Sequence, residues 1–287
     1  MKSKISPILW SSLVMVAALA LTLFIAVREK LFIETNQIVS PDVSLAPVTL
    51  YFFGVVAVMA VVLFLIPLKW LKYVFKTLFA LMFAWGAFVV AGLNAPPMVA
   101  YALGAVAGFA WLFWARIWLH DLLLLVALAG AGSVFGFLFS PWTFMIFMLI
   151  IAVYDFLAVR FGFMVWMADR LSETTSLPAF IFPKQMKDWK LKLEMVRFGE
   201  LKDKTSEERE YAVLGGGDIG FPLMLAVSVF FATDLSGAIV VGAFAVVGLI
   251  SAFLIQIFWL KGKPMPALPP IAFFSLIGFI IATQLMG

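Results

Sequence analysis

Two aspartates lie in segments whose other residues are almost all apolar. Asp155 falls within Ile150–Val159, and Asp218 directly follows three consecutive glycines. A carboxylate near the centre of a bilayer costs roughly 2.5–3.5 kcal/mol on insertion scales. A chain that keeps two such groups on consecutive apolar segments is therefore expected to use them for catalysis or for ion movement.

The chemistry open to two neighbouring carboxyl groups is acid–base catalysis. They cannot both ionise readily at close range, so they share one proton. The ionised group can activate a water molecule while the protonated group polarises a carbonyl, and the two later exchange roles to protonate a leaving amine. This chemistry needs neither a metal nor a side-chain nucleophile, which suits a chain with no cysteine and one histidine, His120. Thiolate and multi-histidine metal sites are excluded, and we predict no metal and no cofactor.

The elements that position the aspartates are predicted to be membrane-spanning helices. The chain has 287 residues, of which 64% are hydrophobic, whereas a soluble domain averages about 45–50%. A spanning helix needs about 20 mostly apolar residues. Nine segments qualify, and they predict an all-α, multi-pass integral membrane protein, in the cell membrane if the chain is prokaryotic: 8–27, 48–67, 74–93, 97–115, 122–139, 142–168, 211–231, 237–259 and 267–286.

The distribution of basic residues orients the nine predicted spans. With nine spans, all Lys and Arg residues except Arg28 and Lys30 fall on one side of the membrane. By the positive-inside rule this side is cytoplasmic, so the N-terminus is predicted to be cytoplasmic and the C-terminus outside. His120 falls in the short break before the fifth span, and we expect it at the level of the lipid headgroups.

The chain divides into three predicted parts. Residues 1–168 form a six-span part with Asp155, residues 169–210 a cytoplasmic hydrophilic loop, and residues 211–287 a three-span part with Asp218. We interpret the loop as a solvated linker, although Leu177–Pro183 could instead be a gating segment.

The two aspartates are predicted to lie at a similar depth in the membrane. Asp155 lies five residues before Arg160, and Asp218 lies seven residues after Tyr211. At a helical rise of 1.5 Å per residue, both fall within about 10–20 Å of the cytoplasmic end. Because consecutive spans are commonly neighbours, the two carboxyl groups are expected to meet in the cytoplasmic half of the membrane.

Residues beside the aspartates could shape a site. Gly215, Gly216 and Gly217 place little bulk next to Asp218, so another backbone can approach; ordinary packing between membrane helices is the alternative. The Tyr154 hydroxyl could bond within the site, or its ring could face lipid.

A proline-rich segment precedes the last predicted span. Four prolines fall within residues 264–270 and are expected to prevent a regular helix there. An extended segment of this kind, with Pro266, Ala267 and Leu268 in it, could pair with an extended peptide by strand addition. The alternative is a simple turn into a helix.

Together these three motifs resemble the presenilin and signal-peptide-peptidase family of intramembrane aspartyl proteases. Tyr154-Asp155 resembles the family's Tyr-Asp, residues 215–218 its Gly-x-Gly-Asp, and residues 266–268 its Pro-Ala-Leu. The resemblance implies that Asp155 and Asp218 are a catalytic dyad, that Pro-Ala-Leu shapes the active site, and that the substrates are transmembrane proteins cut within their spans. The compact length looks like that of a microbial homologue, which we expect to act without obligatory accessory subunits.

Other classes of protein share parts of this pattern with an intramembrane aspartyl protease. A proton- or cation-coupled transporter or channel also uses paired intramembrane carboxylates, but no internal repeat is visible. A prepilin-peptidase-like enzyme would place its first aspartate in a cytoplasmic loop, and a scaffold would leave both aspartates without a role. A serine intramembrane protease is excluded because Ser133 is not followed by glycine. Membrane lipid is the expected environment, nucleic-acid binding is not expected, and a homo-oligomer is left open.

Overall fold

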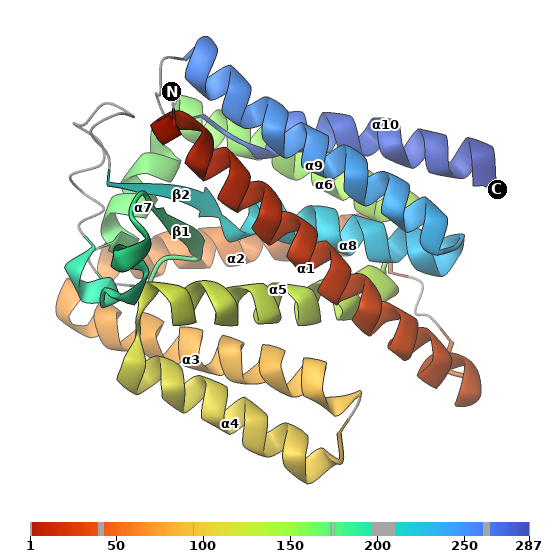
Figure 1. The fold of residues 1–287 in the computed structure, drawn as a ribbon, viewed down its shortest axis with the longest axis horizontal. Helices are drawn as coiled ribbons and strands as arrows, with labels where there is room; N and C mark the ends of the chain where they lie inside the picture. The colour runs from red at the N-terminus through yellow and green to blue at the C-terminus, as the bar shows by residue number, and fades with distance from the viewer. Residues whose placement is uncertain are drawn as a thin grey trace.

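The computed structural model describes residues 2–39, 43–93, 95–172, 174, 176–196, 210–260 and 265–286. Within these ranges the chain is mostly helical, as predicted (Figure 1). The elements are α1 (Lys2–Thr35), α2 (Leu45–Leu65), α3 (Leu68–Gly92), α4 (Pro97–Trp114), α5 (Ile117–Leu138), α6 (Pro141–Arg160), α7 (Phe163–Ser172), β1 (Ala179–Pro183), η1 (Met186–Lys190), η2 (Leu193–Met195), β2 (Tyr211–Gly215), α8 (Gly216–Ala232), α9 (Leu235–Phe258) and α10 (Leu268–Met286).

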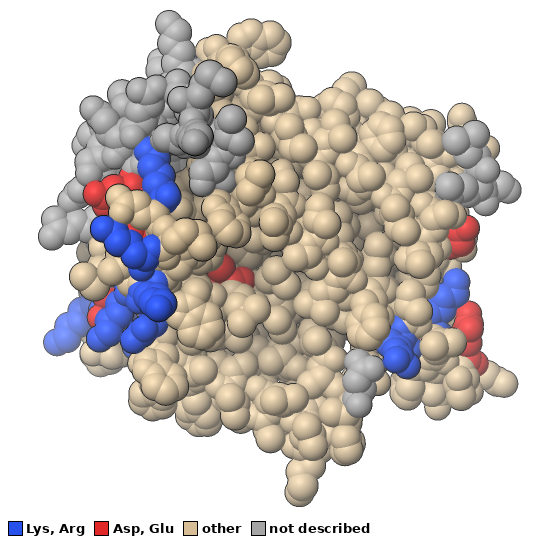
Figure 2. Space-filling view, viewed as in Figure 1, with Lys and Arg blue, Asp and Glu red and all other residues tan. Residues whose placement is uncertain are grey.

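The helix lengths fit a membrane protein. Among the described residues, seven helices are long and apolar enough to cross a bilayer, and α8 and α10 are shorter apolar helices. The chain ends lie at opposite ends of the long axis (Figure 1). On the face seen in Figure 2, charged side chains gather at two opposite ends and leave the surface between them largely uncharged. The number of apolar helices agrees with the predicted nine, while the assignment of one end to the cytoplasm stays a prediction.

Two predicted span boundaries are corrected. The sixth span was expected to reach residue 168, but α6 ends at Arg160. Gly162 has φ +76°, a left-handed conformation that suits glycine and separates α6 from α7. The seventh span was expected to begin at residue 211, but Tyr211–Gly215 is a strand and the helix begins only at Gly216.

A β-hairpin occupies part of the segment expected to be a solvated linker. β1 and β2 are antiparallel, with Ala179 opposite Gly215 and Pro183 opposite Tyr211. All five residues of β1 are buried. The linker interpretation is therefore wrong for this stretch, and Leu177–Pro183 belongs to the packed structure. Residues 197–209, the rest of the predicted linker, lie outside the described residues.

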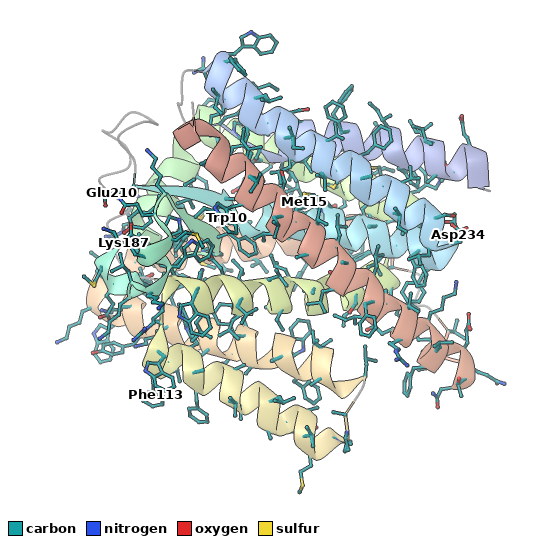
Figure 3. The ribbon with its side chains drawn as sticks, viewed as in Figure 1. Trp10, Met15, Phe113, Lys187, Glu210 and Asp234 are labelled. Carbon is teal, nitrogen blue, oxygen red and sulfur yellow. The ribbon has the colours of Figure 1, made fainter. Side chains whose placement is uncertain are left out.

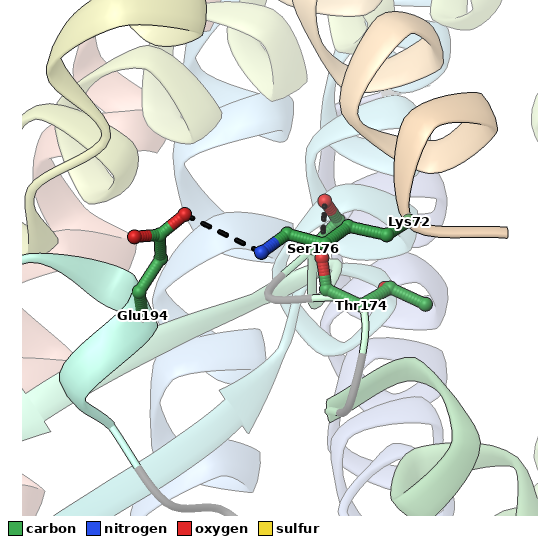
Figure 4. A network of polar contacts seen from close by, with 4 residues as sticks. All are labelled: Lys72, Thr174, Ser176 and Glu194. Carbon is green, nitrogen blue, oxygen red and sulfur yellow. Dashed lines mark hydrogen bonds and ion pairs between the residues drawn. The ribbon is translucent and has the colours of Figure 1, made fainter. Parts of the chain in front are cut away.

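The segment after β1 also packs on the bundle. Trp189 of η1 contacts Trp10 of α1, with ring centroids 5.7 Å apart and edge to face. Trp10 lies on the same half of the bundle as Lys187 and Glu210, whereas Asp234 lies at the opposite end (Figure 3). Lys72 of α3 approaches Glu194 at 3.5 Å (Figure 4). This ion pair is exposed, so the Trp–Trp contact is the stronger restraint.

Helix α5 is the central helix of the bundle. It packs against α1, α3 and α8, and it contains buried residues along most of its length. The contact with α8 is close, because a Cβ built on Gly136 would lie 2.5 Å from Val227 Cβ and 2.8 Å from the Met224 carbonyl oxygen. By contrast, Leu63 is the one buried residue among those described in α2.

We predict that Gly136→Ala destabilises the protein, because the added methyl group forces α5 away from α8. Overpacking of this kind costs about 1–3 kcal/mol, more than the gain in helix propensity from removing glycine. The measurement is the apparent melting temperature in detergent. Gly54→Ala is the matched control, since a Cβ at Gly54 meets nothing within 4 Å. Equal melting temperatures for the two variants would contradict the prediction.

Candidate active site

Asp218 lies in the first turn of α8. Gly215 is the residue that caps this helix, so Asp218 is its third helical residue. The backbone N–H of Gly215 donates a hydrogen bond to the Asp218 carboxyl group, in the manner of the acidic partner of a capping box. The positive end of the helix dipole therefore faces this carboxyl group. This placement differs from the prediction, which counted Asp218 seven residues into a helix.

Asp155 lies five residues before the end of α6 and is 6% exposed. Its carboxyl group accepts a hydrogen bond from the backbone N–H of Leu268, the first residue of α10. Its Oδ2 atom is buried and has no hydrogen-bond partner among the described residues. Each aspartate thus receives an N–H from the start of a different helix.

The two aspartates face one site. α6, α8 and α10 contact one another pairwise, and the carboxyl groups of Asp155 and Asp218 are close enough for their charges to interact. Asp218 is half-buried. On the face seen in Figure 2, acidic atoms are visible at the floor of a hollow between the two charged ends. The two carboxyl groups therefore form a pair, and Asp218 is only partly shielded from solvent.

The start of α10 combines an irregular segment with a regular helix. Met265, Pro266 and Ala267 are not helical, and α10 begins at Leu268. Pro269 and Pro270 fall in its first turn, where a missing N–H leaves no helical bond unmade. The expectation that the prolines exclude helix through residue 270 is therefore wrong for these two. Residues 261–264 lie outside the described residues.

The β-hairpin sets the start of α8. The Gly216 N–H donates to the Pro178 carbonyl oxygen at 2.8 Å. A Cβ on Gly216 would lie 3.1 Å from that oxygen, and a Cβ on Gly215 would lie 3.0 Å from Asp218 Oδ2. These two glycines therefore allow close approaches, whereas Gly217 is exposed.

Tyr154 packs in an aromatic cluster beside the site. Its ring meets those of Phe52 and Phe53 edge to face, at centroid distances of 6.3 and 5.5 Å. Phe52 also contacts Phe147 of α6 and Phe221 of α8. The Tyr154 ring therefore faces α2, and this cluster links α2 to the helices that carry the aspartates.

His120 does not lie where the sequence predicted. It was expected in a loop at the headgroup level, but it is fully buried in the first turn of α5. Its neighbour Asp121 is 6% exposed and was not singled out from the sequence. The sequence feature that could have identified Asp121 is the adjacent polar pair His120-Asp121 at the start of an apolar run. Within the described ranges, no three His, Cys, Asp or Glu side chains gather closely enough to hold a metal ion.

Comparison with known proteins identifies the family. Residues 12–287 match the sequence profile of the family described as signal-peptide peptidase, presenilin aspartyl protease. The chain belongs to this family. It is therefore an intramembrane aspartic endopeptidase that acts on transmembrane substrates. The family predicted from the three motifs is confirmed, and nothing in the comparisons supports the transporter alternative.

Solved structures share the fold of this protease. A presenilin family intramembrane aspartate protease in space group C222 has a TM-score of 0.64 and 18% sequence identity, over 97% of this chain and 99% of that one. A structure described in the same words in space group P2 has a TM-score of 0.51 and 20% identity, over 94% and 97% of the two chains. A comparison with curated protein sequences gives no match.

We predict that Gly215→Ala lowers kcat of the protease more than Gly217→Ala. The Gly215 methyl group would press on the Asp218 carboxyl group at 3.0 Å, whereas the Gly217 methyl group would meet the Phe221 ring at 3.2 Å and no carboxyl group. A displacement of about 1 Å at a reacting group can cost 100-fold in rate. Steady-state cleavage of a single-span substrate measures kcat for both variants, and an equal or smaller loss for Gly215→Ala would contradict the prediction.

Proposed function

We propose that Asp155 and Asp218 are the catalytic dyad of this protease. The support is one observation: two carboxyl groups from α6 and α8 interact in an apolar bundle, and each accepts an N–H from the start of a helix. Such a pair holds one proton between two groups. Tyr154, Gly215, Gly216, Gly217, Pro266, Ala267 and Leu268 are proposed to shape the site around it.

Peptide hydrolysis follows from this arrangement. The ionised carboxyl group takes a proton from water as the water oxygen attacks the scissile carbonyl carbon. The protonated carboxyl group donates a hydrogen bond to the carbonyl oxygen, which gains negative charge. As the C–N bond breaks, a carboxyl group delivers the proton to the leaving amine. The Gly215 and Leu268 N–H groups stabilise whichever carboxyl group is ionised at each step.

Substrate handling is proposed to depend on the irregular backbone beside the dyad. A transmembrane helix must be unwound before water can attack it, and an extended peptide needs backbone partners. Met265–Ala267 is not helical and leads directly into the Leu268 N–H that meets Asp155. We therefore propose that residues 266–268 dock the unwound substrate. If the predicted orientation holds, these substrates have their N-terminus outside.

We also propose a three-part organisation of the chain and a protease that needs no other subunit. Residues 1–168 are proposed as a part that carries Asp155, residues 169–210 as the connecting segment, and residues 211–287 as a part that carries Asp218 and the Pro-Ala-Leu segment. We propose that the protease acts without obligatory accessory subunits; a homo-oligomer is compatible with this.

We predict that Asp155→Ala and Asp218→Ala each abolish cleavage of a single-span test substrate by the purified protein in liposomes. The remaining carboxyl group cannot be ionised as the base and protonated as the acid at the same time, so one of the two roles is unfilled and the dyad no longer works as a unit. Product fragments are measured by mass spectrometry.

Asp234→Asn is the matched control for these variants. This carboxylate lies at the start of α9, at the end of the bundle away from Lys187 and Glu210 (Figure 3), and accepts the Gly237 N–H at 2.8 Å. Hydrogen bonds from Ser236 and Gly237 hold its pKa below the usual value, so the Asn variant tests loss of charge away from the dyad. Full activity of either dyad variant would refute the assignment of that aspartate.

A further inference from the structure

A buried polar pair on α5 takes no part in the proposed chemistry. His120 is fully buried and Asp121 is 6% exposed. His120 Nε2 lies 3.0 Å from the Ala179 carbonyl oxygen, and Asp121 Oδ1 accepts the Ile181 N–H at 3.1 Å. Because a carbonyl oxygen can only accept, His120 Nε2 carries the proton. Both partners are backbone atoms of β1.

These contacts fall on one edge of β1. At the two ends of the hairpin, the Pro178 carbonyl accepts the Gly216 N–H and the Lys184 N–H donates to the Glu210 carbonyl. In an antiparallel ladder alternate residues bond to the partner strand. The even-numbered residues of β1 therefore bond to β2, and Ala179 and Ile181 turn their backbone groups away from it. His120 and Asp121 meet this outer edge where a third strand would lie.

An outer strand edge buried in an apolar bundle is costly without such partners. Each unpaired backbone group in this setting costs about 1–3 kcal/mol, and sheet edges must be paired or covered. The residues just before His120 also bind the segment that follows η1. The Ile117 N–H donates to the Leu191 carbonyl oxygen, and the Leu193 N–H donates to the Ala115 carbonyl oxygen. The start of α5 thus holds the whole stretch from β1 to η2.

Strand β1 is linked by a hydrogen bond to the helix that carries Asp218. Pro178, the residue before β1, accepts the N–H of Gly216, the first residue of α8. The same helix α5 touches the start of α8 directly, because Leu128 lies 3.7 Å from a Cβ built on Gly216 and 3.2 Å from one built on Gly220. The start of α8 is therefore fixed from α5 both directly and through β1.

We propose that His120 and Asp121 are positioning residues that set the place of Asp218 through β1. This inference rests on the proposed role of Asp218 in the dyad. The pair acts through its hydrogen-bonding groups: the Asp121 oxygen must accept and the His120 nitrogen must donate, while the negative charge of Asp121 is not required.

The experiment compares variants that keep each hydrogen bond with variants that remove it, in the full-length protein in liposomes. Asp121→Asn keeps an acceptor oxygen and Asp121→Leu removes it. His120→Gln keeps an N–H donor. His120→Phe keeps only a ring to pack against Phe79, Phe83 and Trp111, which surround the imidazole. kcat and KM for a single-span substrate are measured together with the melting temperature.

The expected result is a split between the two kinds of variant. Asp121→Leu and His120→Phe lower kcat by about 10- to 100-fold with little change in KM, since a misplaced carboxyl group affects the chemical step. Asp121→Asn and His120→Gln stay within about fivefold of the parent. Ser133→Ala is the control: Ser133 is a buried polar residue of the same helix whose hydroxyl bonds Gly130 and Glu29, away from β1, and its kcat should equal that of the parent.

Two results would overturn the proposal: parental kcat in Asp121→Leu and His120→Phe, or an Asn variant as inactive as the Leu variant. If the apolar variants do not fold, Asp121→Ala and His120→Ala replace them, with backbone hydrogen exchange over residues 177–183 as the readout. Faster exchange there, with α9 unchanged, supports the proposal, and unchanged exchange refutes it. Failure of the dyad assignment is recognised separately, by activity in Asp155→Ala or Asp218→Ala.

Discussion

Two helix starts converge on two carboxyl groups inside an apolar bundle, and the rest of the structure depends on this arrangement. The first N–H groups of a helix have no partner within it and carry a partial positive charge. α8 offers the Gly215 N–H to Asp218, and α10 offers the Leu268 N–H to Asp155. These bonds offset part of the cost of a carboxylate at this depth. They also require that both helices begin at the site, where glycines occupy the cap and first turn of α8 and prolines flank the first residue of α10.

The surrounding elements hold these two helix starts in place. α5 packs against α8 at a glycine contact that leaves no room for a side chain, and the hairpin β1–β2 leads directly into α8. On the other side, an aromatic cluster around Phe52 joins α2 to α6 and α8. α2 contributes a single buried residue among those described, so it is the least restrained of the spans that approach the dyad.

Much of this architecture is readable from sequence, because a bilayer allows few structures. Apolar runs of about 20 residues must be helices when they cross lipid, and the apolar helices lie where hydropathy places them. The boundaries at Arg160 and Gly216 were not predictable in this way, since an apolar strand such as Tyr211–Gly215 has the same hydropathy as the helix that follows it. The burial of His120 and Asp121 was not predicted for another reason: it is favourable only because β1, about 60 residues later in the chain, supplies backbone partners.

Asp155 and Asp218 are proposed to act as one catalytic unit, and a double-mutant cycle measures whether they do. Cleavage rates are compared for the parent, Asp155→Asn, Asp218→Asn and the double variant, with sensitivity down to the uncatalysed rate. Residues that work as a unit are strongly non-additive. If the two carboxyl groups act as a unit, the double variant cuts no more slowly than either single variant. Independent losses that multiply in the double variant would contradict it and show that the two carboxyl groups work separately.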